Sequence, residues 1–209
     1  VEIGVVTAVQ GLRWYTIELH GFPAHAGPTP MEGRRDPARV IARIISRVYD
    51  VVEDNAPWGR GTFAQFGSEP ISPNTIPERL WCTLDLRHPE LAVLEDMEAR
   101  MRAIVAEEAG TLGVEGNVIE LAEIAPTTFD ENCIASVESA VTELGFSHRR
   151  IVSGAGHDAC YVALHAPTSM IFVPCLDGLS HNEAEDITKE QAEQGASVLL
   201  GAVRRAAGG

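Results

Sequence analysis

The order in which two hydrophobic periods follow one another most constrains the fold of this chain. Residues 12–21 alternate apolar and polar side chains like a half-buried strand, and residues 36–54 then place apolar side chains at helical spacing. Two strand-like runs, a helical run and a last strand-like run follow, at residues 61–70, 79–88, 90–110 and 117–125. This β-α-β-β-α-β order predicts a ferredoxin-like domain, in which an antiparallel sheet carries both helices on one face.

The pattern changes to alternating helix and strand after residue 125. Helices are expected at residues 133–145, 157–164 and 189–207, with strands at 149–154 and 169–174. So few strands make a marginal sheet alone, and alternation is typical of an α/β domain with a sheet of parallel character. We therefore expect residues 1–9 and 125–209 to belong to one α/β domain, of which only part is present, and residues 10–124 to form the domain inserted in it.

Charge and cysteine usage exclude several classes of partner. Sixteen Lys and Arg residues stand against thirty Asp and Glu residues, so the net charge is −14, which disfavours nucleic acid and anionic membranes. The four cysteines form no C-x-x-C pair, and there is no apolar run of about 18 residues that would span a membrane. We predict a cytoplasmic protein in which an anionic substrate would need a local cationic pocket.

Three histidines lie where a ligand could be bound. His25 is expected on a stiff, proline-rich turn that could hold a hydrogen-bond donor in place, although a surface turn is the alternative. His157 follows Gly156 at a strand-to-helix turn that allows close approach of a ligand, or that simply begins a helix. His181 follows the carboxyl end of a strand, and its imidazole could bind zinc or manganese. A metal site needs three or more ligands, so a structural role for His181 is the alternative.

Asn74 and Arg87 could bind an anion. Arg87 ends the alternating strand 79–88, and Asn74 lies in the proline-rich connection before it. A guanidinium can bind a carboxylate through two hydrogen bonds, and a carboxamide can add a donor beside it. An arginine at a strand end is often only a surface residue, which is the alternative here.

Taken in order, four stretches resemble a known family. GFPAHAGPTPMEGRRDPA, SPNTIPERLWCTLDLRH, SGAGHDA and MIFVPCLDGLSHNEAED are similar to successive motifs of the M20-type metallo-amidohydrolases. The branch is that of N-carbamoyl-L-amino-acid hydrolases, ureidopropionases and allantoate amidohydrolases. Departures are Pro28 in place of a threonine, Thr75 in place of a valine, and Asn182-Glu183 in place of Ser-Pro. The resemblance implies an α/β catalytic domain interrupted by a ferredoxin-like lid domain that also forms a homodimer.

The resemblance also implies roles for the candidate residues. His181 matches the last ligand of a centre of two divalent ions, zinc or manganese, and His25 matches a lid histidine that polarises the scissile carbonyl in the partner subunit's site. Asn74 and Arg87 match lid residues that hold the carboxylate of a small anionic substrate. Gly156 and His157 match a loop that lines the substrate pocket.

The resemblance implies hydrolysis of a linear amide bond in an N-carbamoyl-L-amino acid or an allantoate-like ureido acid, with release of ammonia. The motifs for the remaining metal ligands and the general base are absent from this chain. We therefore expect the C-terminal half of a binuclear amidohydrolase, inactive without its N-terminal half. The alternatives are a non-catalytic, dimerising lid and scaffold fragment that binds no metal, and an M20 peptidase or aminoacylase.

Overall fold

The structure is a computed structural model, and it describes residues 1–208. The chain divides into two compact units. Unit 1 contains residues 1–10 and 127–208, and unit 2 contains residues 11–126. No helix of residues 1–208 is both long enough and apolar enough to cross a membrane.

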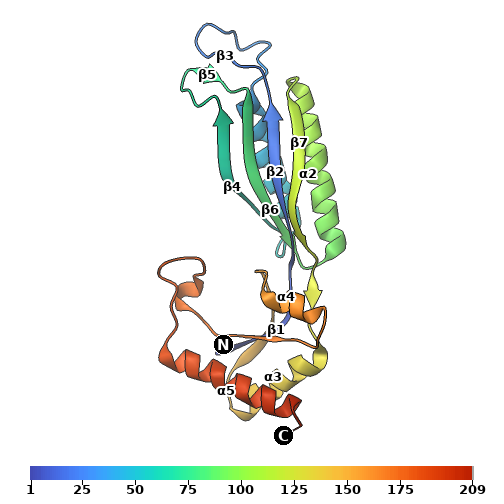
Figure 1. The fold of residues 1–209 in the computed structure, drawn as a ribbon, viewed down its shortest axis with the longest axis vertical. Helices are drawn as coiled ribbons and strands as arrows, with labels where there is room; N and C mark the ends of the chain where they lie inside the picture. The colour runs from blue at the N-terminus through green and yellow to red at the C-terminus, as the bar shows by residue number, and fades with distance from the viewer. Residues whose placement is uncertain (209) are drawn as a thin grey trace. The chain divides into compact units, whose positions relative to one another are not determined.

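Unit 2 has the predicted ferredoxin-like fold. Its antiparallel sheet has the strand order β4-β6-β2-β7, and helices α1 and α2 cover one face (Figure 1). The elements are β2 (Gly11–His20), α1 (Pro37–Asp54), β4 (Arg60–Glu69), β6 (Arg79–His88), α2 (Leu91–Thr111) and β7 (Glu115–Ile124). The sequence periods therefore identified every long element of this unit, with bounds within about two residues.

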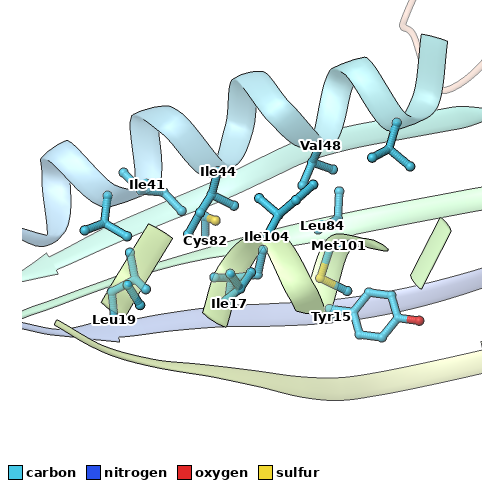
Figure 2. Close-up of a cluster of buried hydrophobic side chains, with 14 of the residues drawn as sticks. Tyr15, Ile17, Leu19, Ile41, Ile44, Val48, Cys82, Leu84, Met101 and Ile104 are labelled. Carbon is cyan, nitrogen blue, oxygen red and sulfur yellow. The ribbon is translucent and has the colours of Figure 1, made fainter. Parts of the chain in front are cut away.

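The core of unit 2 forms where the helical and strand periods meet. Alternate residues of β2, among them Tyr15, Ile17 and Leu19, are fully buried against the helices. Ile44 and Val48 face them from α1, as Figure 2 shows. Burial of one such aliphatic side chain is worth about 2 kcal/mol, so this layer is a main source of stability for the unit.

A small second sheet lies at one end of unit 2. Strands β3 (Ala24–His25) and β5 (Thr75–Ile76) pair antiparallel beyond the end of the main sheet at which β2 ends and β6 begins (Figure 1). The N–H of Gly21 donates to the carbonyl of Glu78 at 2.7 Å. This bond joins the segment that follows β2 to the segment that precedes β6. We call this end of unit 2 the tip.

Unit 1 is built around β1 (Ile3–Val9). β9 (His148–Ser153) pairs parallel to β1 on one side, whereas β10 (Met170–Phe172) and β8 (Thr127–Thr128) pair antiparallel on the other. Helices α3 (Glu131–Glu143) and α5 (Lys189–Ala206) pack on each other, and α4 (Asp158–Ala163) and the 3-10 turn η1 (Leu176–Gly178) are short. The α/β class predicted for this region is confirmed.

The expected parallel character holds for β9 but is wrong for β10. The helix between these strands, α4, has six residues and therefore spans only about 9 Å. It does not carry the chain back along the length of β9, so β10 starts near the end where β9 finishes. The carboxyl ends of β9 and β10 consequently lie at opposite ends of the sheet. Strand direction alone therefore does not bring His181 close to Gly156.

Candidate active-site residues

His25 lies at the tip of unit 2 with a defined tautomer. It belongs to β3, its side chain is exposed, and its Nδ1 accepts a hydrogen bond from the N–H of Gly27 at 3.1 Å. A backbone N–H can only donate, so Nδ1 carries no proton and the neutral imidazole holds its proton on Nε2. The Nε2–H group is the kind of donor that can polarise a carbonyl or stabilise an oxyanion.

Asn74 lies beside His25 at the tip. The pairing of β3 with β5 places Thr75 opposite His25, and the carbonyl of Asn74 accepts the N–H of Ala26 at 2.8 Å. The Oδ1 atom of Asn74 accepts the Ser72 hydroxyl at 2.8 Å. Ser72 therefore occupies the acceptor atom of Asn74. The NH₂ group of this exposed side chain is the part that can donate a hydrogen bond to a ligand.

Arg87 lies at the other end of the sheet. It is near the end of β6, eight residues past Arg79, which corresponds to about 27 Å along the strand from the tip. The expectation that Asn74 and Arg87 of one chain grip the same carboxylate together is therefore not met within unit 2. The proline-rich connection and the strand were recognised correctly, but the eight residues of β6 that precede Arg87, residues 79–86, separate the two side chains.

Asp85 holds the guanidinium of Arg87. Its carboxylate accepts hydrogen bonds from Nε of Arg87 at 3.0 and 3.1 Å and from Nη2 at 2.6 Å. Alternation along β6 puts both side chains on the face away from the helices, since Leu86 between them is fully buried. Sequence reasoning missed Asp85, although a D-x-R spacing on a strand predicts two side chains on one face.

His157 follows β9 in unit 1 and is held by two neighbours. Its Nε2 lies 3.1 Å from the hydroxyl of the buried Ser153, and its ring meets Phe172 edge to face at 5.5 Å. Gly156 before it is exposed. His157 is the N-cap residue of α4, but its side chain makes no capping hydrogen bond. The imidazole therefore does not cap the helix. Ser153 was not recognised from the sequence.

His181 lies in the exposed loop between β10 and α5. Its backbone is in the left-handed region, with φ of 55°, and its N–H donates to the Glu185 carboxylate at 3.0 Å. Asp177 in the same loop also has a positive φ, of 52°. For residues other than glycine this conformation costs about 1–2 kcal/mol, and such strain is concentrated at functional sites.

The described residues do not by themselves form a metal centre. Within residues 1–208 no three His, Cys, Asp or Glu side chains lie close enough together to hold an ion. His181 could supply one ligand, whereas a zinc site needs three or four. The donor set in this chain thus does not fit a complete centre.

The fold and these motifs define the class of protein. Residues 4–205 match peptidase family M20/M25/M40, and the chain belongs to this family. Within it, the chain is similar to amidohydrolases. It is 44% identical over 202 residues to an N-carbamoyl-L-amino-acid amidohydrolase of Rhizobium meliloti. The aligned region covers 97% of this chain and 49% of that protein. An allantoate amidohydrolase of Bacillus subtilis is 34% identical over 198 residues, covering 95% and 48%.

A solved structure has the same fold over nearly the whole chain. It is a crystal structure of an amidase of the hydantoinase/carbamoylase family from Burkholderia vietnamiensis, with a TM-score of 0.91 and 50% identity. The similarity covers 96% of this chain and 48% of that one. This chain spans about half the length of the curated relatives it matches.

Proposed function

We propose that this chain is part of an amidohydrolase that cleaves the linear amide C–N bond of an N-carbamoyl-L-amino acid or of an allantoate-like ureido acid and releases ammonia. The similarity to enzymes named for these two substrate classes supports the choice of substrate. The observation that carries the chemistry is the hydrogen bond from Gly27 to Nδ1 of His25, which leaves the imidazole proton on Nε2.

His25 acts on the carbonyl oxygen of the substrate. As the carbonyl carbon becomes tetrahedral, negative charge builds on that oxygen, and the Nε2–H of His25 donates to it. One such donor contributes on the order of 3 kcal/mol to the transition state. The amide of Asn74, at the same tip, is a second donor for the same substrate.

Arg87 binds the substrate's carboxylate. A planar guanidinium can form two parallel hydrogen bonds with a carboxylate, and it can contact a second carboxylate besides that of Asp85. The tip and Arg87 are about 27 Å apart along β6, too far for one small substrate. We therefore assign His25 and Asn74 to a site completed by Arg87 of a second copy, in a homodimer.

Gly156 and His157 are assigned to the lining of the substrate pocket, and His181 to one ligand of a pair of divalent ions, zinc or manganese. The other metal ligands and the general base are assigned to a part of the protein outside this chain.

The test uses the full-length protein encoded by the gene. Purified enzyme is given N-carbamoyl-L-amino acids and allantoate, and ammonia release is measured before and after chelation and after return of zinc or manganese. We expect metal-dependent release with at least one substrate class, and no release from N-carbamoyl-D-amino acids. Cleavage of dipeptides or N-acyl-L-amino acids instead, with no ammonia from either class, would assign the protein to the M20 peptidases or aminoacylases.

A non-catalytic, dimerising scaffold is the second candidate, favoured by the absence of a metal-binding set within residues 1–208. Metal analysis, sedimentation and a turnover assay of the 209-residue chain can contradict the second candidate. A dimer without bound metal fits both candidates, and only the full-length assay then separates them. Stoichiometric zinc or manganese together with turnover by this chain alone would contradict the scaffold.

A further inference from the structure

The guanidinium of Arg34 donates hydrogen bonds to carbonyl groups of the turn that follows His25. Its Nη2 donates to the carbonyl of Ala26 at 2.8 Å and also to that of Thr29, and its Nε donates to the carbonyl of Pro30 at 3.1 Å. These three acceptors span residues 26–30, directly after the histidine. Arg34 itself is half-buried near the start of α1.

One of these contacts bears directly on the imidazole. The carbonyl of Ala26 and the N–H of Gly27 belong to the same peptide group, which is planar. Arg34 holds the oxygen side of this group, and the N–H side donates to Nδ1 of His25. Fixing the direction of the C=O therefore fixes the direction of the N–H, and a cationic donor on the oxygen also strengthens the bond made by the N–H.

Side-chain packing contributes little to holding this turn. A cavity of about 350 Å³ lies next to it, lined by Phe22, Thr29, Arg34 and Ile76 among others. Phe22 is 63% exposed and Met31 is 60% exposed, whereas Ile76 of β5 is buried, so few apolar side chains are buried around the turn. Hydrogen bonds define its shape: those of Arg34, the bond from Ala26 N–H to the Asn74 carbonyl, and a long bond of 3.4 Å from Thr29 N–H to the His25 carbonyl.

We propose that Arg34 is a positioning residue, which fixes the turn at residues 26–30 and thereby the orientation and the Nε2–H tautomer of His25. The inference rests on the function proposed above only for its effect on catalysis. The structural part concerns this chain alone. A lysine cannot replace Arg34 in this role, because one ammonium group cannot reach three separate carbonyls in a planar fork.

The experiment measures the tautomer first. In the ¹⁵N-labelled chain, long-range imidazole couplings report which nitrogen of His25 carries the proton, and hydrogen exchange reports the protection of the Gly27 amide. The variants are Arg34→Gln and Arg34→Lys. The matched control is Arg35→Gln, since Arg35 is the adjacent, exposed arginine and makes no side-chain hydrogen bond in the part of the chain that the structure describes.

We expect the Nε2–H tautomer in the wild type and in Arg35→Gln. In both Arg34 variants we expect a mixture of tautomers and exchange of the Gly27 amide at least about tenfold faster, because charged hydrogen bonds are lost. Retention of the wild-type tautomer and protection in both variants would overturn the proposal. If Arg34→Gln disturbs the fold, Arg34→Lys keeps the charge and provides the same two readouts.

Kinetics of the full-length enzyme separate this inference from the proposed function. We expect Arg34→Gln to lower kcat by roughly tenfold or more with little change in KM, because the donor acts in the transition state. A changed tautomer with unchanged kcat would leave the positioning role of Arg34 intact, and would instead contradict the role of His25 in catalysis. Arg35→Gln should leave kcat and KM unaltered.

Discussion

Asp85 decides how the guanidinium of Arg87 is presented. Its carboxylate takes the Nε and Nη2 edge, which fixes the plane of the group. Three other polar candidates are held in a similar way by a neighbour that itself has no assigned role in the reaction. Gly27 bonds His25, Ser72 bonds Asn74, and Ser153 bonds His157. Such supporting contacts are what keep a binding group in a productive geometry.

Under the proposed function, in which Arg87 binds the substrate's carboxylate, Arg87→Lys in the full-length protein should raise KM roughly ten- to a hundredfold and leave kcat nearly unchanged. The reason is that a point charge loses the paired hydrogen bonds to the carboxylate in ground and transition states alike. Asp85→Asn should move KM in the same direction by a smaller factor. Steady-state kinetics with an N-carbamoyl-L-amino acid measure both.

Arg60→Lys is the control for this series. Arg60 is the cross-strand partner of Arg87, and its own guanidinium is held by the carbonyls of Pro57 and Gly59 at 2.6 and 2.9 Å. A KM that rises as much in Arg60→Lys as in Arg87→Lys would mean that replacing either arginine of this cross-strand pair disturbs the sheet in a general way, and would contradict a specific carboxylate contact of Arg87.

Cys82 should resist thiol reagents in the folded chain. Burial in the core of unit 2 raises the pKa of its thiol to about 12, so almost no thiolate is present at pH 8. Mass spectrometry after brief treatment with iodoacetamide should find Cys82 unmodified, and modified once the chain is denatured. Modification of Cys82 as fast as that of the less buried Cys175 would contradict the buried position.

The sequence motifs identified the candidate residues, but not the residues that hold them. Asp85 could have been found, because residues two apart on a strand share a face. Arg34 and Ser153 could not, since their partners are backbone carbonyls and a ring nitrogen that come within reach only when the turns have folded. The sequence around His181 likewise does not show whether this histidine binds a metal ion together with other ligands.

At the scale of the elements, the length of a strand decided whether it could be predicted from the sequence. The ten-residue strands β2, β4, β6 and β7 alternate long enough to show their period. The two-residue strands β3, β5 and β8 have no period to detect, and they were not predicted. β10 was expected to be parallel because helices and strands alternate in this region, but the six-residue α4 is too short to return the chain along β9.

The contact between α3 and β9 should make unit 1 sensitive to acid. Glu138 on α3 accepts two hydrogen bonds from Arg150 on β9, which lower the pKa of Glu138 below its usual value of 4.5. A carboxyl whose pKa is lower in the folded state contributes stability above the unfolded pKa, and loses it as pH falls through the folded pKa. The thermal unfolding temperature should therefore fall more steeply below about pH 4.5 in the wild type than in Glu138→Gln.

The matched control is Glu193→Gln, which removes an exposed carboxyl of α5 and should leave the acid slope of the wild type unchanged. The effect of Glu138 is modest, because surface ion pairs contribute only about 0.2–1 kcal/mol. Identical slopes for the wild type and Glu138→Gln would show that Arg150 does not lower the pKa of Glu138.

At the scale of the whole molecule, each unit has its own hydrophobic core. Unit 2 is a single continuous stretch, so we expect residues 11–126, expressed alone, to fold and to unfold cooperatively, as measured by circular dichroism. Met101→Ala, at a fully buried position, should lower its stability by about 2–5 kcal/mol. The exposed Met31→Ala should change it by less than about 0.5 kcal/mol.

A fragment of residues 11–126 that is unstructured would contradict the independence of this core. An equal effect of Met101→Ala and Met31→Ala would do so as well, since a collapsed but unpacked chain does not distinguish an internal methionine from a surface one.

The pairing of β1 with β8 has a consequence for how such proteins can be recombined. Val9 and Thr127 are direct partners in that ladder, and Leu12 and Ile124 are direct partners in unit 2. The two crossings between the units thus start from adjacent strands, about 5 Å apart. The equivalent of unit 2 from a homologous protein could be transplanted by splicing at these two neighbouring points, without redesign of the separate core of unit 1.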